Sequence, residues 1–207
     1  MQPPNEAEIA RFIALADELT PPSFAAYLDV AVHTGMRPGE LDALRWSKID
    51  LQAETIVVDE KWCPKTRVIN EPKHHHIRTI ALTEPARDRL LHLPHENKFA
   101  FTTLRGQHYR PTSQIYHWNR VRAAVGYGNV DFYTVTRHFF GWYALNILEL
   151  PDHVIAAQLG HRDGGKLVRT TYGHPDARLA RERVREAFRQ APPAPVPLAA
   201  TLMRHLA

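Results

Sequence analysis

HTGMRPGELDALRW, residues 33–46, joins two predicted helices through a tight turn. Thr34-Gly35 ends the first helix, because glycine is a common residue just beyond a helix C-terminus. Pro38 begins the second helix at a first-turn position, where its missing N–H costs little. Arg37 therefore stands at a helix entrance. Taken alone, this pattern favours an ordinary surface arginine, so its meaning depends on the rest of the chain.

Helices are predicted on both sides of this turn. Residues 5–19 carry apolar side chains at spacings of three and four, as one face of an amphipathic helix does, and residues 24–33 predict a more buried helix. Further helices are expected at 38–44, 83–91, 112–125, 135–148, 151–159 and 177–189.

A β pattern interrupts the helical regions. Its short runs rich in β-branched residues lie at 56–58, 67–69 and 78–82. Pro64 and Pro72 stand between these runs. The expected fold class is therefore mainly α-helical with a small antiparallel three-stranded sheet.

The composition suits one globular domain, or one domain with a short appendage. The 207 residues are 44% hydrophobic and 23% charged, which excludes intrinsic disorder, a collagen-like repeat and a coiled coil. There is no run of 18 apolar residues, and the N-terminal stretch lacks the apolar core of a secretory signal, so neither a membrane span nor secretion is expected. Cys63 is the single cysteine, which excludes an internal disulfide and a thiolate-rich zinc site and fits a reducing cytoplasm.

The formal charge of +4 is unevenly distributed. Residues 1–60 hold 11 acidic and 4 basic residues, whereas residues 61–207 hold 11 acidic and 22 basic ones. Segment 104–122 contains four arginines and no acid, with aromatic and histidine side chains between them. Such a surface suits a polyanion and predicts a nucleic acid as partner. A solvated basic surface explains the composition alone equally well.

Residues 71–82, EPKHHHIRTIAL, place Lys73 on a hairpin beside three histidines. Neighbouring side chains on a strand point to opposite faces, so His74, His75 and His76 converge on one metal ion only if the strand is distorted. A histidine-rich metal-binding protein is therefore a weak alternative. No metal and no cofactor are expected.

Two later segments contain further polar groups among apolar or basic neighbours. TVTRHFFGWYALN, residues 134–146, places Arg137 near the start of an aromatic-rich helix. QLGHRDGGKLVRTTYGH, residues 158–174, ends a helix at Gly160-His161 and places Tyr172 eleven residues later in a polar stretch. Each segment alone also fits ordinary packing.

The C-terminal residues predict a linker and a tail. APPAPVP, residues 191–197, is expected to be extended. Beyond it, Leu198, Leu202 and Leu206 recur every four residues on a short helix, 198–207, which is marginal unless it docks. The tail docks either on its own domain or on a neighbouring protomer.

In their order along the chain, these clusters closely resemble the catalytic domain of the tyrosine recombinase (phage integrase) family. The resemblance runs from residue 5 to about residue 188 and includes LRWSKIDL at 44–51 and RTIALT at 78–83. It implies a catalytic domain over 1–190, without the N-terminal core-binding domain that the family normally adds. The catalytic residues that it implies are Arg37, Lys73, Arg137, His161 and the nucleophile Tyr172, all converging on one basic concave face. Glu40 matches an acidic residue that supports the first arginine.

One position departs from the family pattern. Thr134 stands where a histidine is common. A hydroxyl can donate to a phosphate oxygen, but unlike imidazole it does not take up a proton near neutral pH. The adjacent Tyr133 is a second candidate for the same space.

The resemblance implies an enzyme that cleaves and rejoins DNA strands in site-specific recombination or integration, through a 3′-phosphotyrosyl intermediate and without metal ion or ATP. Lys73 would protonate the departing 5′-oxygen, and His161 would bond the phosphate or accept the Tyr172 proton. The implied partners are double-stranded DNA and further copies of the chain, tetrameric in a synaptic complex, in a cytoplasmic, bacterial or phage-encoded setting. The alternatives are a type IB topoisomerase-like relaxation activity and a catalytically decayed DNA-binding remnant.

Overall fold

The computed structural model describes residues 3–71, 77–173 and 177–190. The chain divides into one compact unit up to Gly173 and a second from His174 onward, and each is described by itself. Within these ranges no helix combines the length and the apolar character needed to cross a membrane.

Helix α2 (Pro22–Thr34) is the centre of the first unit. Its residues from Phe24 to Val32 are all buried. The helix packs against α1 (Glu6–Leu19), α4 (Glu84–Leu91), the turn η3 (Thr134–His138) and α6 (Phe139–Asn146). Asn5 caps α1 by accepting the N–H of Glu8, so the chain enters this layer in a defined direction.

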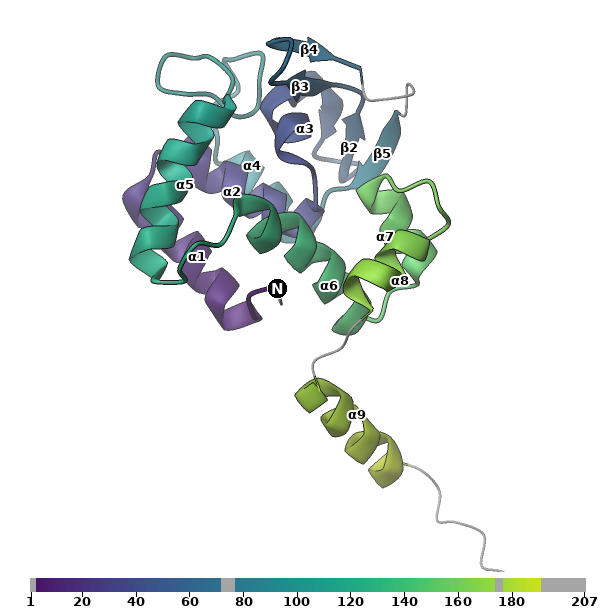
Figure 1. Ribbon diagram of the computed structural model, residues 1–207. Helices are drawn as coiled ribbons and strands as arrows, with labels where there is room; N and C mark the ends of the chain where they lie inside the picture. Colours follow the sequence, from purple (N-terminus) through teal and green to yellow (C-terminus); the bar gives the residue numbers. More distant parts are fainter. Residues whose placement is uncertain (1–2, 72–76, 174–176, 191–207) are drawn as a thin grey trace, which may run out of the picture. The chain divides into compact units, whose positions relative to one another are not determined.

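The remaining elements of this unit surround α2 (Figure 1). The helices are α3 (Pro38–Ala43), the 3₁₀ turn η1 (Trp46–Lys48), α5 (Pro111–Val125), the π-helical turn η3 (Thr134–His138), α6 (Phe139–Asn146), α7 (Asp152–Leu159) and α8 (Lys166–Tyr172). Figure 1 shows α1 and α5 along one side of α2 and α6–α8 toward the other, with the strands at the far end.

The structure contains two small antiparallel sheets. The three-stranded sheet has the order β1 (Ile49–Asp50), β2 (Thr55–Val58), β5 (Arg78–Ala81), with Ile56 opposite Ile80 and both side chains in the core. A separate hairpin pairs β3 (Lys61–Cys63) with β4 (Val68–Asn70). The mainly α-helical class with a three-stranded sheet is therefore confirmed.

The strand membership differs from the prediction. The run at 67–69 was expected in the main sheet, but β4 pairs only with β3, and the two-residue strand β1 takes the third place. A two-residue strand has no detectable alternation of apolar and polar residues, so periodicity does not reveal it.

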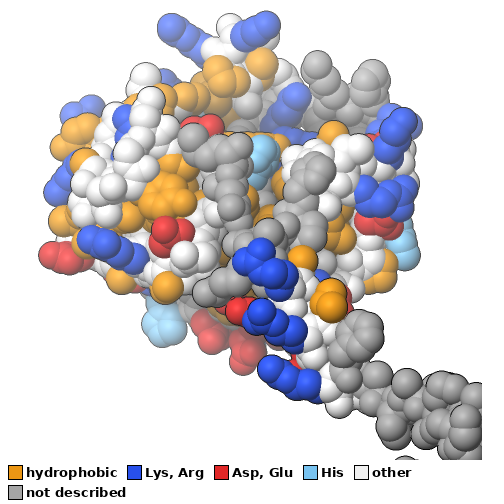
Figure 2. Space-filling model, turned by 60° about the horizontal axis from the view of Figure 1, so that its bottom comes forward, with side chains coloured by type: hydrophobic (Ala, Val, Ile, Leu, Met, Phe, Trp, Pro, Cys, Tyr) orange, Lys and Arg blue, Asp and Glu red, His pale blue; other side chains and the backbone are white. Residues whose placement is uncertain are grey.

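The second unit contains α9 (Ala177–Gln190). Arg181, Arg185 and Arg189 recur every four residues along it, and Figure 2 shows basic side chains following one another along this helix. The predicted linker 191–197 and tail helix 198–207 lie outside the described residues.

Candidate active site

The turn after α2 brings the end of α2 into contact with α6 and α7. Gly35 ends α2 in the left-handed region with φ 67°, as the sequence predicts. A Cβ at this position would lie 2.6 Å from Leu159 Cδ2 and 2.7 Å from Phe140 Cδ1, so a larger residue would push away both α7 and α6. This close approach places the Gly35 carbonyl beside the residues of η3.

Glu40 links two arginines from different elements. Arg78, at the start of β5, donates to both carboxylate oxygens over 3.0 and 2.8 Å, and Arg37 Nη1 donates to the same carboxylate over 3.0 Å. The Arg37 backbone N–H adds a fourth bond of 2.9 Å. Although burial acts to raise the pKa of Glu40, the hydrogen bonds and charge of Arg78, with the charge of Arg37, lower it to about 2. The carboxylate therefore remains charged and orients both guanidinium groups.

Arg137 lies completely buried in η3, with 0% of its surface exposed. Its Nη1 donates to the Gly35 carbonyl over 2.7 Å, and its Nη2 donates to the Leu159 carbonyl over 2.6 Å. Its buried Nε–H has no hydrogen-bond partner among the described residues. Burial, then the nearby charge of Arg37, lower the pKa of Arg137 from its ordinary value. The cation is held by neutral groups, which leaves it attractive to an anion.

His161 follows α7 and contacts Arg137 directly. Its Nε2 lies 3.0 Å from Arg137 Nη2, and because arginine only donates, Nε2 accepts this bond. The neutral ring then carries its proton on Nδ1, which is buried and unpartnered among the described residues. Burial, followed by the charges of Arg137 and Arg37, lowers the pKa of His161 to about 4. At neutral pH this residue is therefore a hydrogen-bond donor and is uncharged.

Tyr172 is the last residue of α8 and is 5% exposed. Its ring lies against Gly141 of α6, where a Cβ would come within 2.4 Å of Tyr172 Cε2. Asn146 Nδ2 donates to the Tyr172 carbonyl over 2.8 Å, which anchors the helix end. Burial and the neighbouring Tyr133 raise the pKa of Tyr172 to about 12, while Arg137 and Arg37 act to lower it.

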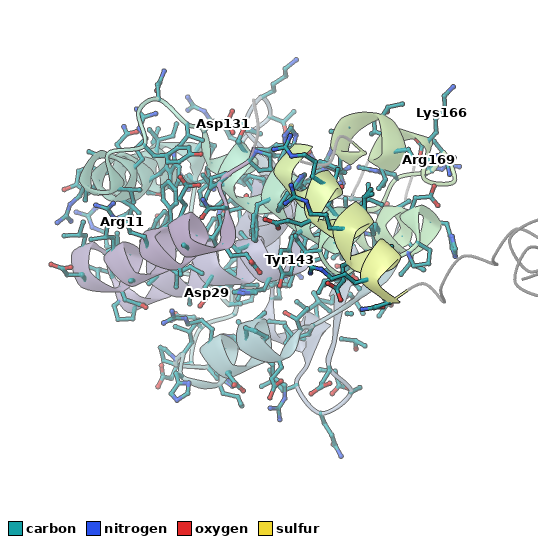
Figure 3. The ribbon with its side chains drawn as sticks, turned by 90° about the horizontal axis from the view of Figure 1, so that it is seen from below. Arg11, Asp29, Asp131, Tyr143, Lys166 and Arg169 are labelled. Carbon is teal, nitrogen blue, oxygen red and sulfur yellow. The ribbon has the colours of Figure 1, made fainter. Side chains whose placement is uncertain are left out.

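Helix α8 is an element that the sequence did not predict. Gly165 is the N-cap of this helix, and the Asp163 carboxylate, two residues earlier, accepts the N–H groups of Gly165 and of Leu167 in the first turn. Arg169 pairs with Asp152 of α7, and Figure 3 shows Arg169 and Lys166 on the outer side of α8. The helix thus turns Tyr172 inward and its cationic residues outward.

The structure brings Arg37, Arg137, His161 and Tyr172 together, while Lys73 lies outside the described residues. Thr134 begins η3 with a side chain that is 8% exposed, and its N–H donates to Asp131 Oδ1 over 2.6 Å. Arg137 and Tyr172 are enclosed, and of these four residues only Arg37, whose side chain is 40% exposed, reaches solvent substantially, so that their convergence on one basic concave face stays a prediction. The enclosure comes from α8, which packs the tyrosine ring onto α6.

Arg78 is the residue that sequence reasoning missed. Its two bonds to Glu40 and the Nε bond to the Gln158 carbonyl, 3.2 Å, connect β5, α3 and α7 around the arginine cluster. The available signal was its position in the strand. Thr79 points outward and Ile80 inward, so Arg78, two residues before Ile80, occupies an inward position. A charge at an inward position calls for a buried partner.

The phage integrase family profile matches residues 5–178. The chain belongs to the phage integrase family. No curated protein sequence matches it.

Solved structures of recombinases share the fold of this family member. XerA recombinase matches with a TM-score of 0.68 and 21% identity over 93% of this chain and 66% of that one. A Tn1549 transposon integrase in complex with circular intermediate DNA matches with a TM-score of 0.72 and 16% identity, over 89% and 65%. The lambda integrase catalytic core matches with a TM-score of 0.61 and 18% identity, over 79% and 94%. The chain thus spans just under two thirds of the first two proteins and most of a catalytic core.

Proposed function

We propose that this protein cleaves and rejoins DNA strands by site-specific recombination through a 3′-phosphotyrosyl intermediate. The observation that carries the proposal is the anchored Arg137, whose Nε–H lies in one cluster with the Nδ1–H of His161 and the phenol of Tyr172; neither N–H has a hydrogen-bond partner within the described parts of the chain. A buried cation with unused donors beside a hydroxyl is an arrangement that favours a phosphodiester.

The residues supply the chemistry as follows. Tyr172 Oη attacks phosphorus, the new O–P bond forms, and the bond from phosphorus to the 5′-oxygen breaks. Arg37, Arg137 and His161 donate to the non-bridging oxygens, on which charge increases in the transition state. Because His161 Nε2 already accepts from Arg137, His161 serves as a donor to phosphate and does not take the Tyr172 proton. We assign the proton for the 5′-oxygen to Lys73, and the proton lost from Tyr172 returns to that amine through solvent.

A basic hollow beside α5 supports DNA as the substrate. This cavity of about 590 Å³ lies between the loop 103–110 and the start of α5. Arg105, Arg110, His108 and His117 line it together with hydroxyl and amide side chains, and none of the described lining residues carries a carboxylate. Cations and aromatic groups without acids suit a phosphate backbone and its bases. The Tn1549 integrase neighbour is itself a complex with DNA.

The wider assembly is part of the proposal. We propose double-stranded DNA and a tetramer of the chain in a synaptic complex, with residues 1–190 as the catalytic domain and the leucines of 198–207 as a docking helix. Catalysis by arginine, lysine and histidine requires neither a metal ion nor ATP in this scheme. The single cysteine, Cys63, supports a cytoplasmic location.

Covalent capture on DNA tests the function. The protein is incubated with nicked duplexes whose arms carry random sequence, complexes that survive denaturation are isolated, and the attached DNA is sequenced. We expect selected duplexes to be linked through Tyr172, and the Tyr172→Phe variant to bind but not become linked. A chain that binds these duplexes without any covalent product is a remnant, whereas relaxation of a supercoiled plasmid without strand exchange identifies a topoisomerase-like activity.

A further inference from the structure

Three aromatic rings lie in a row from η3 to α8. The ring of Tyr133, the residue before η3, meets the His138 ring edge-to-face with centroids 4.8 Å apart and planes at 72°. The His138 ring in turn meets the Tyr172 ring edge-to-face, with centroids 5.7 Å apart and planes at 77°. Tyr133 is therefore only one ring removed from the proposed nucleophile.

The π-helical turn is what produces this row. In η3 the Phe139 N–H donates to the Thr134 carbonyl, five residues back, so positions five apart become neighbours along the turn. Tyr133 and His138 are five apart. An α-helical turn would align Tyr133 with Arg137 instead. With the wider turn, Arg137 is buried in the core while Tyr133 contacts His138, and His138 contacts Tyr172.

Tyr133 lies where its hydroxyl can contact a bound ligand. Its side chain is half-buried, unlike the enclosed Arg137. Its phenol lies close enough to Tyr172 and Arg137 to act on both electrostatically. It helps to raise the pKa of Tyr172 and opposes the lowering of the pKa of Arg137. One hydroxyl thus lies within the field of both the proposed nucleophile and the buried guanidinium.

We propose that the Tyr133 hydroxyl donates a hydrogen bond to a non-bridging oxygen of the reacting phosphate, which makes Tyr133 a further catalytic residue. This inference rests on the proposed function. Arg37, Arg137 and His161 approach the phosphate from α3, η3 and α7, and Tyr133 approaches from the side of the ring row. Tyr133 keeps its proton throughout: the bond from Tyr172 Oη to phosphorus forms, the bond to the 5′-oxygen breaks, and no atom is transferred through Tyr133.

The choice between Tyr133 and Thr134 follows from their contacts, because the Tyr133 ring is linked through His138 to Tyr172, whereas Thr134 is bound to Asp131. Thr134 is 8% exposed, and its backbone N–H donates a hydrogen bond to the Asp131 carboxylate, which stabilises the turn. Figure 3 labels Asp131. The threonine thus shapes the turn, and the tyrosine before it provides the hydroxyl for phosphate.

The test compares Tyr133→Phe with the wild-type chain on a duplex obtained by the covalent capture above. Phenylalanine keeps the ring contact with His138 and removes only the hydroxyl. We expect single-turnover formation of the Tyr172 adduct to slow by about 10²-fold, the usual effect of losing one transition-state donor. The dissociation constant for DNA and the melting temperature should change little. Tyr143→Phe is the matched control, because Tyr143 is also half-buried but interacts with Glu6 of α1.

A chemical substitution in the DNA makes the test specific for phosphate contact. In a methylphosphonate duplex a methyl group replaces one non-bridging oxygen at the reacting position. With the stereoisomer that lacks the oxygen facing Tyr133, we expect Tyr133→Phe and wild type to react at rates within threefold of each other. The proposal is overturned if Tyr133→Phe reacts at the wild-type rate on ordinary DNA, if its defect is unchanged on both stereoisomers, or if peptide mapping finds the phosphotyrosine at residue 133. A wild-type chain that forms no adduct on any duplex overturns the proposed function itself.

Discussion

Glu40 shows how one buried carboxylate determines the direction of two arginines. The Arg78 guanidinium binds both of its oxygens while the Arg37 side chain binds one, so removal of Arg78 leaves the buried Glu40 carboxylate without its main cationic partner. We expect Arg78→Ala to lower the free energy of unfolding by roughly 3–5 kcal/mol, the usual loss for half of a buried pair. Urea unfolding measures this. Arg87→Ala is the control, since Arg87 reaches the exposed Glu54 over 3.8 Å, and a loss of equal size there would refute the argument.

The protonation state of His161 leads to a second prediction for a single residue. Its pKa of about 4 lies below the ordinary value, so the ring is neutral in the folded protein at every pH above about 5. As a donor through Nδ1–H, it should be replaceable by asparagine, whose amide also donates. We expect His161→Asn to keep adduct formation within about tenfold of wild type and His161→Ala to lose about 10²-fold, measured in single turnover at pH 7. If only the imidazole supports reaction and the rate follows a titration near pH 6.5, His161 is a base.

Among the elements, α6 and α8 together position Tyr172, the proposed nucleophile. Gly141 costs α6 some helix stability, roughly 1 kcal/mol relative to alanine, and its absent side chain gives the Tyr172 ring its place. We expect Gly141→Ala to displace the ring and slow adduct formation by about 10²-fold, while noncovalent DNA binding stays nearly unchanged. Ala144→Gly, on the same helix, is the control for helix stability. Retention of the wild-type rate by Gly141→Ala would show that the ring leaves this position before it reacts.

A buried polar cluster joins three other helices and makes stability depend on pH. Tyr27 of α2 lies 3.0 Å from Asp42 Oδ1 of α3, and Gln114 of α5 donates to the Tyr27 hydroxyl. Burial raises the pKa of Asp42 to about 8, although the bond from Tyr27 acts in the opposite direction. The unfolded chain ionises this group from about pH 4, so the stabilisation is full below that pH and declines as the pH rises through 8.

Asp42→Asn removes this titration. Compared with wild type, we expect it to raise the free energy of unfolding by on the order of 2 kcal/mol at pH 8 and to change it little at pH 4. Thermal and urea unfolding across this range measure the difference. Asp88→Asn, at an exposed position, should show no such trend, and a constant offset between wild type and Asp42→Asn at all pH values would contradict the assignment.

The sequence predicted the helices that show local signals, such as apolar periodicity or a glycine or proline at an end, and the order of the candidate site residues along the chain. It did not predict that Arg137 and Tyr172 are enclosed. Gly35 and Pro38 specify the turn at Arg37 by local backbone chemistry, and the structure has that turn. Helix α8 was missed because two threonines weaken its helix propensity and because its N-cap is Gly165, which supplies no side-chain cap. The burial of Tyr172 depends on its contact with Gly141, far away in the sequence. Such contacts depend on tertiary packing, which a single sequence does not show.

For the whole molecule, the uneven charge leads to a prediction about the proposed binding of DNA. The basic excess lies after residue 60, and the cavity beside α5 presents exposed cations, with no carboxylate among its described lining residues, so most phosphate contacts should come from this part. Each contact releases counterions, and the logarithm of the binding constant should fall linearly with the logarithm of salt concentration, by about 0.9 per phosphate.

Arg105 provides the sharpest test of where the DNA lies. It is exposed and lines the cavity, so Arg105→Gln should weaken binding to any sequence and reduce the salt slope by about 1. Arg11→Gln is the matched control: Arg11 is also an exposed arginine, on α1 in the acidic part of the chain (Figure 3), and its removal should leave the slope unchanged. Fluorescence anisotropy with a labelled duplex between 50 and 200 mM salt, roughly the range over which such binding changes most, measures both slopes. Because both variants lose the same formal charge, a difference between them reports the position of the phosphates and not the net charge of the protein, and equal slopes for the two would place the DNA on another face.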